Sequence, residues 1–128
     1  MPGGVREDKG FFDVVEYVAW LKARGLSVGI DVQITLGHYR RQLNTDLEQA
    51  VTRLREIGYP HLRLIDRTPE KEYAEMFCGR VVLQPYHASV FADRISGVTL
   101  DALAAGSPVI VSAGTWSADE VTRTGAGV

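Results

Sequence analysis

Short apolar segments alternate with segments of helical periodicity along this chain, and this alternation constrains its fold most strongly. The apolar, β-branched segments 26–34, 61–65, 81–84 and 108–112 are expected to be strands. Helical spacing of apolar residues, or helix start signals, mark the segments 11–24, 45–57, 69–77, 96–105 and 117–124. Alternating strands and helices, with several strands apolar throughout, are typical of a parallel sheet with helices on both faces. We therefore predict one doubly wound, Rossmann-like α/β domain over residues 1–128.

Several helix ends are marked by capping residues. Ser96 is expected to cap a helix that ends at Gly106. Thr68 and Pro69 read as the N-cap and first residue of another helix, and Ser117 with Glu120 as a capping box. These assignments give the expected positions of the helix N-termini, near which a ligand could bind.

Composition excludes several classes of function. Hydrophobic residues make up 45% of the chain and charged residues 23%, so a folded domain with a substantial core is expected. The net charge of −2, with Lys and Arg scattered, gives no basic surface for nucleic acid. The N-terminal residues lack a basic segment followed by an apolar core, so no signal peptide is expected. No apolar run approaches the roughly 20 residues that span a bilayer, so a cytoplasmic location is expected.

Metal and thiol chemistry are not expected. The single cysteine, Cys78, cannot form an internal disulfide and is expected to be a buried structural thiol. His38, His61 and His87 lie far apart without ligand-type spacing, so we expect no metal site. The glycine-rich phosphate-loop, dinucleotide and nucleophile-elbow motifs are absent as well.

A ligand is expected beyond the carboxyl ends of the strands, near helix N-termini. The segments that could lie there are 3–10, 66–69, 85–97 and 113–117. In the first of them, Arg6 and Lys9 could face one anion, but a solvated terminal turn is the favoured interpretation of this segment taken alone. This segment is therefore a candidate phosphate site only in combination with others.

The segment 85–97 is richer in polar groups and ends at a predicted helix N-terminus. Backbone N–H groups of Ser96 and Gly97 could hold a diphosphate, favoured by the helix dipole. Asp101 follows a little more than one turn later in an otherwise apolar stretch, where the paired hydroxyls of a ribose could be its partners. The sequence pattern equally allows Asp101 to face solvent or to pair with an arginine.

Residues 96–110, Ser-Gly-Val-Thr-Leu-Asp-Ala-Leu-Ala-Ala-Gly-Ser-Pro-Val-Ile, resemble a motif of the retaining GT-B glycosyltransferases related to sucrose synthase, the glycosyl transferases group 1 of family 4. That family carries two glutamates separated by seven residues. Asp93 and Asp101 occupy these positions here, and Lys9-Gly10 looks like the family's phosphate loop. The resemblance covers nearly the whole chain in the expected order and implies the donor-binding half of a GT-B fold.

The resemblance also implies roles for single residues. Asp101 would bind the ribose, and Asp93 would contact the transferred sugar as the catalytic position. Ser96 and Gly97 would hold the diphosphate with help from Arg6 and Lys9. The remaining substrate-binding candidates are Tyr86 and Arg94, and residues 66–68 would lie near the base.

A complete enzyme of this kind transfers a hexosyl group from a nucleotide-diphosphate sugar to an acceptor bound by a separate N-terminal domain or subunit. The chain would then be truncated at both ends relative to the full enzyme, inactive alone and independent of metal, while the full enzyme could associate peripherally with a membrane. A non-catalytic nucleotide or nucleotide-sugar binding module is the first alternative. A receiver-like interaction domain is the second, although Asp31 and Asp66 alone make a sparse acidic cluster.

Overall fold

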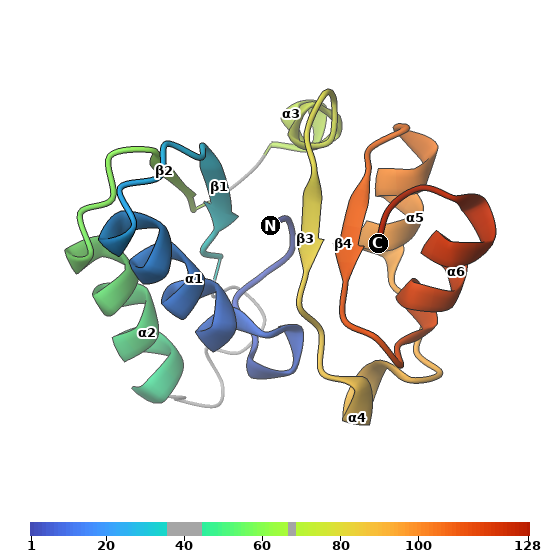
Figure 1. The fold of residues 1–128 in the computed structure, drawn as a ribbon, viewed down its shortest axis with the longest axis horizontal. Helices are drawn as coiled ribbons and strands as arrows, with labels where there is room; N and C mark the ends of the chain where they lie inside the picture. Colours follow the sequence, from blue (N-terminus) through green and yellow to red (C-terminus); the bar gives the residue numbers. More distant parts are fainter. Residues whose placement is uncertain (36–44, 67–68) are drawn as a thin grey trace. The chain divides into compact units, whose positions relative to one another are not determined.

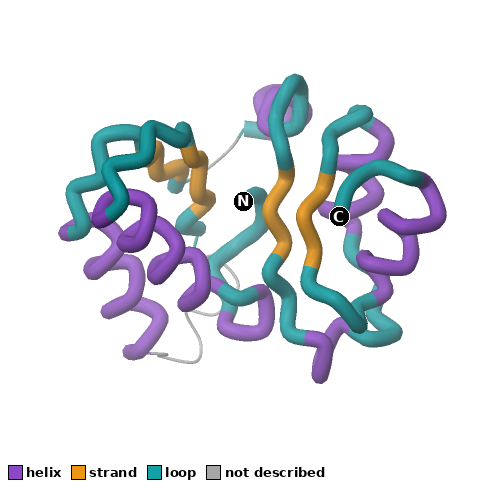
Figure 2. Tube along the Cα trace, in the orientation of Figure 1, coloured by secondary structure: helices purple, strands orange, loops and turns teal. Residues whose placement is uncertain are grey.

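The computed structural model describes residues 1–35, 45–66 and 69–128. The chain forms two compact units, the first made of Met1 and Gly3–Arg67 and the second of Pro2 and Thr68–Val128. Each unit contains helices and one described sheet of two parallel strands (Figures 1 and 2). The prediction of an α/β chain with parallel strands is therefore confirmed.

The first unit follows the predicted order of elements. Its elements are a 3-10 helix Glu7–Lys9, α1 Phe11–Ala23, β1 Ile30–Gln33, α2 Thr45–Glu56 and β2 Leu62–Ile65. The strands pair in parallel, with Ile30 opposite Leu62 and Gln33 opposite Ile65. The helical spacing predicts the buried apolar residues of both helices, namely Phe11, Val14, Val15, Val18 and Leu21 in α1 and Leu47, Ala50, Val51 and Leu54 in α2. Ile57, which is expected in the same stripe, follows α2 and is half-buried.

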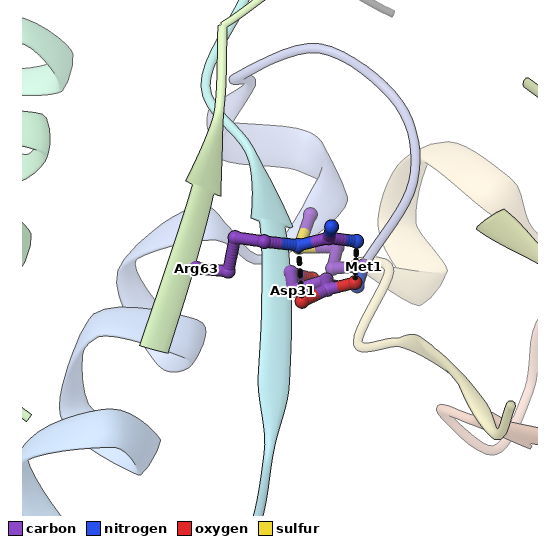
Figure 3. A network of polar contacts seen from close by, with 3 residues as sticks. All are labelled: Met1, Asp31 and Arg63. Carbon is purple, nitrogen blue, oxygen red and sulfur yellow. Dashed lines mark hydrogen bonds and ion pairs between the residues drawn. The ribbon is translucent and has the colours of Figure 1, made fainter. Parts of the chain in front are cut away.

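The N-terminal residues of this unit run beside β1. The amino group of Met1 donates to the carbonyl oxygen of Asp31 at 2.6 Å, and the amide of Gln33 donates to the carbonyl of Met1 at 3.2 Å. On the facing strand, the Arg63 guanidinium makes two hydrogen bonds to the Asp31 carboxylate, at 3.0 and 2.5 Å (Figure 3). This pair joins β1 to β2, and because Arg63 is exposed the solvent screens the ion pair and limits its contribution to stability.

The second unit repeats the alternation of strand and helix. Its elements are α3 Glu70–Tyr73, a 3-10 helix Ala74–Met76, β3 Val82–Gln84, α4 Ala88–Phe91, α5 Gly97–Ala104, β4 Val109–Val111 and α6 Trp116–Thr124. β3 and β4 are parallel, with Val82 opposite Val109 and Gln84 opposite Val111. The last residues extend this ladder, because the Val128 amide donates to the carbonyl of Val109 at 3.0 Å.

One apolar core holds the second unit together. It consists of Phe77, Val82, Ala102, Val109 and Val121. Since Ala102 of α5 and Val121 of α6 pack on the same strand residues, both helices cover one face of the β3–β4 pair. Side chains alternate along a strand, so Ile110 points to the opposite face, where it is 44% exposed.

Two helix starts differ from the predictions. The N-cap of α6 lies two residues earlier than expected, at Thr115 and not at Ser117. The Thr115 hydroxyl accepts a hydrogen bond from the Ala118 amide at 3.2 Å. Pro69 occupies the N-cap position of α3 and not its first helical turn. The expected capping role of Thr68 lies outside the described residues.

The segment 69–77 and Cys78 also depart from expectation. The helix predicted there ends as an α-helix at Tyr73 and continues as a 3-10 turn. The expected burial of Cys78 is wrong: the residue is exposed, and its Sγ lies 3.6 Å from the Ala74 carbonyl oxygen. Among the described residues, no helix is long and apolar enough to cross a membrane.

Candidate functional site

The polar segments of the second unit gather at the carboxyl ends of its two strands. Residues 85–97 follow β3 and residues 112–115 follow β4, and the Ser112 amide donates to the carbonyl of Gln84 at 3.3 Å. A Cβ placed on Gly114 would lie 3.6 Å from the Cβ of Ala88, so the two loops are neighbours. Two of the four segments predicted to surround a ligand therefore meet at one edge.

The start of α5 is built as the sequence predicts. Ser96 has an extended backbone, and its hydroxyl accepts from the Thr99 amide at 3.3 Å, which makes it the N-cap. Gly97 is the first helical residue and is exposed, and a Cβ added there would meet no atom within 4 Å. The first N–H groups of a helix have no partner within the helix, so this turn offers donors to an anion in open space.

A buried polar network lies directly beneath this turn. Thr99 of α5 donates to Gln84 Oε1 of β3 at 2.8 Å, and its hydroxyl also shares a hydrogen bond of 2.8 Å with Ser117 of α6. All three side chains are at most 1% exposed. The network therefore ties the first turns of α5 and α6 to the carboxyl end of β3. Sequence reasoning did not identify it, because the three residues carry no spacing signal.

Asp101 has a partner that the sequence did not indicate. Its Oδ2 accepts a hydrogen bond of 2.9 Å from the Tyr73 hydroxyl of α3. Burial raises the pKa of Tyr73 well above its ordinary value, and the hydrogen bond to the Asp101 carboxylate and the charge of that carboxylate raise it further. The residue is exposed, so Asp101 faces solvent while being held by a tyrosine and not by an arginine.

Asp93, Arg94 and Tyr86 occupy different environments in the same loop. Asp93 and Arg94 are exposed, and the Arg94 guanidinium lies 5.2 Å from the centre of the Phe91 ring. Tyr86 is buried, with its ring 4.5 Å from that of Phe91 and its hydroxyl 3.5 Å from Gln84 Nε2. Tyr86 therefore packs beneath the loop surface on which the two charged residues lie.

Arg6 and Lys9 belong to the first unit, whereas the other candidate residues belong to the second. The Arg6 guanidinium makes two hydrogen bonds to the Asp8 carboxylate, one of them at 2.8 Å from Nε to Oδ1 and the other from Nη2 to Oδ2. Lys9 ends the 3-10 helix, and Gly10 follows it with a φ of 69°. A phosphate bound by Arg6 would share the guanidinium with Asp8.

No group of three His, Cys, Asp or Glu side chains within residues 1–35, 45–66 and 69–128 is arranged to hold a metal ion. Comparisons with models of protein families, with curated proteins and with solved structures gave no match.

Proposed function

We propose that the chain is the donor-binding half of a GT-B glycosyltransferase, with its second unit holding a nucleotide-diphosphate sugar. The backbone N–H groups at Ser96 and Gly97 bind the diphosphate, and Asp101 binds the ribose. Asp93 contacts the transferred sugar, and Arg94 is a further residue that binds the donor substrate. The doubly wound sheet and the cytoplasmic location expected of such an enzyme are part of the same proposal.

The observation that supports this most directly is the geometry of residues 93–110. The stretch that resembles the glycosyltransferase motif runs from a polar loop at the carboxyl end of β3 into a capped helix, and then into β4. Ligands of open parallel sheets bind at such an edge, with phosphates at a helix N-terminus. Gly97 is the first residue of that helix, and a Cβ added to it would meet no atom within 4 Å.

The chemistry follows from the charges that develop during transfer. As the bond between the sugar and the diphosphate breaks, negative charge grows on the leaving diphosphate. The N-terminal dipole of α5 stabilises that charge. The acceptor is bound by a separate domain or subunit, so donor binding and not transfer is the activity expected of this chain alone.

Titration calorimetry of the whole chain with UDP, GDP and ADP tests the proposal. We expect one of the three to bind, and Gly97→Ala to weaken that binding about tenfold because a methyl group separates the phosphate from the backbone donors. Gly29→Ala is the matched control, since a Cβ at Gly29 also meets nothing within 4 Å. Failure of a folded wild-type chain to bind any of the three, or equal binding by the Gly97 variant, would overturn the proposal.

A further inference from the structure

The contact between Tyr73 and Asp101 joins two elements that are separate in the chain. Tyr73 is the last residue of α3, and Asp101 lies in the middle of α5. The phenol hydroxyl donates to Oδ2 of the carboxylate at 2.9 Å. Asp101 is exposed, and an exposed aspartate without such a contact would sample several rotamers.

Tyr73 itself is fixed by the core. Its ring packs edge-on against Phe77, with ring centres 5.1 Å apart, and Phe77 is 1% exposed in the centre of the second unit. Phe77 is held in turn by the Ser107 hydroxyl, which donates to its carbonyl oxygen. The orientation of the Asp101 carboxylate is therefore linked to the rigid core through one aromatic side chain.

The contact leaves most of the carboxylate available. An aspartate has two oxygens with about four acceptor positions, and the Tyr73 hydroxyl occupies one of them at Oδ2. A neutral hydroxyl donor on a ligand can approach Oδ1 without displacing the phenol. Fixing a binding group in its bound rotamer beforehand lowers the entropy cost of binding.

We propose that Tyr73 is a positioning residue for nucleotide recognition, which orients the Asp101 carboxylate so that Oδ1 accepts a hydrogen bond from a ribose hydroxyl. The inference rests on the proposed donor site and adds to it a residue that strengthens the preference for ribose. Tyr73 acts through Asp101 and does not touch the ligand. Like any tyrosine below its ordinary pKa of about 10, Tyr73 is protonated at neutral pH, so its hydroxyl is available as a donor.

The preference for ribose over 2′-deoxyribose measures this role. We would titrate the whole chain with UDP, GDP and ADP and with their 2′-deoxy counterparts, for wild type, Tyr73→Phe, Asp101→Ala and the double variant. Wild type is expected to prefer the ribonucleotide about tenfold, because a hydrogen bond to a charged group is lost with the 2′-hydroxyl. Asp101→Ala should abolish the preference, and Tyr73→Phe should reduce it about threefold. Tyr17→Phe is the matched control, since Tyr17 is a partly exposed tyrosine of α1, and it should keep the wild-type preference.

The outcomes separate the inference from the proposed function. If Tyr73 serves stability alone, Tyr73→Phe lowers the unfolding midpoint and leaves the ribose preference unchanged, which overturns the inference. A Tyr73→Phe effect that persists in the Asp101→Ala background means that Tyr73 contacts the ligand directly, which also overturns it. Nucleotide binding without any ribose preference removes the role of Asp101 but leaves diphosphate binding intact. Absence of binding by the folded wild-type chain overturns both proposals.

Discussion

At the scale of single residues, the hydroxyl of Thr99 holds three elements of the second unit together. Its hydrogen bonds to Gln84 and Ser117 are both 2.8 Å long and lie in a region from which water is excluded. A buried polar group that loses its partner costs about 1–3 kcal/mol. The hydroxyl of Thr99 therefore matters more for stability than its methyl group.

A matched pair of substitutions at Thr99 separates the hydroxyl from the methyl group. Thr99→Val keeps the shape and removes both hydrogen bonds, so we expect it to lower the free energy of unfolding by about 2 kcal/mol. Thr99→Ser keeps the hydroxyl and should cost about 1 kcal/mol for the lost methyl group. Urea unfolding followed by tryptophan fluorescence, to which Trp116 beside Ser117 contributes together with Trp20, measures both. A valine variant more stable than the serine variant would show that the network contributes little.

Only some of the side-chain hydrogen bonds in this region could be predicted from the sequence. It predicted Ser96 as a helix cap because the cap and its partner, the Thr99 amide, are three residues apart. The partner of Asp101 lies 28 residues away, on a helix whose length was itself predicted incorrectly. Side-chain contacts over such separations depend on packing, which local spacing does not encode. The network of Gln84, Thr99 and Ser117 was not predicted for the same reason.

At the scale of elements, the start of α6 illustrates the limit of local signals. Thr115 and Ser117 are two residues apart, and both are good N-caps. Ser117 is occupied by its buried hydrogen bond to Thr99, 18 residues away, which leaves Thr115 as the cap. The short α4 was missed because four residues are too few to display a helical period.

Substitution of the caps tests this assignment. Ser96→Ala should cost about 1 kcal/mol of stability, as expected for an N-cap. Thr115→Ala should cost more, up to about 2 kcal/mol, because the Thr115 hydroxyl also donates to the carbonyl of Ser112 at 2.8 Å. Thr122→Ala, at an exposed position of the same helix, is the control and should change stability by no more than about 0.5 kcal/mol. Equal stabilities of the Thr115 and Thr122 variants in urea unfolding would argue against the cap.

At the scale of the whole molecule, the hydrophobic pattern predicted the class of fold better than the extent of its sheets. Strands predicted at 26–34 and 108–112 shorten to Ile30–Gln33 and Val109–Val111. Periodicity marks where apolar residues are, whereas a strand is defined by the neighbour that pairs with it. Ile110 is an apolar residue in a predicted buried strand, yet it is 44% exposed. Burial on both faces therefore could not be inferred from composition at that position.

The dependence of global stability on pH provides the last prediction, through Tyr73. Its pKa is higher in the folded chain than in the unfolded one, mainly because of burial and then because of the hydrogen bond to Asp101. A raised pKa stabilises the fold fully below the unfolded value of about 10, and this contribution is lost as pH rises above about 10 toward the folded value. The free energy of unfolding of wild type should therefore fall more steeply above about pH 10 than that of Tyr73→Phe.

Urea unfolding at intervals between about pH 8 and about pH 10.5 measures this difference. The other four of the five tyrosines are common to both proteins, so their ionisation cancels when the two curves are compared. Below about pH 9.5 the curves should run parallel, separated by the contribution of the hydrogen bond, and above that pH they should converge. Asp101→Ala should behave as an intermediate case, since it removes the hydrogen bond and the carboxylate charge but leaves the burial of Tyr73 in place. Curves that stay parallel throughout would mean that the phenol of Tyr73 ionises as readily in the folded chain as in the unfolded one.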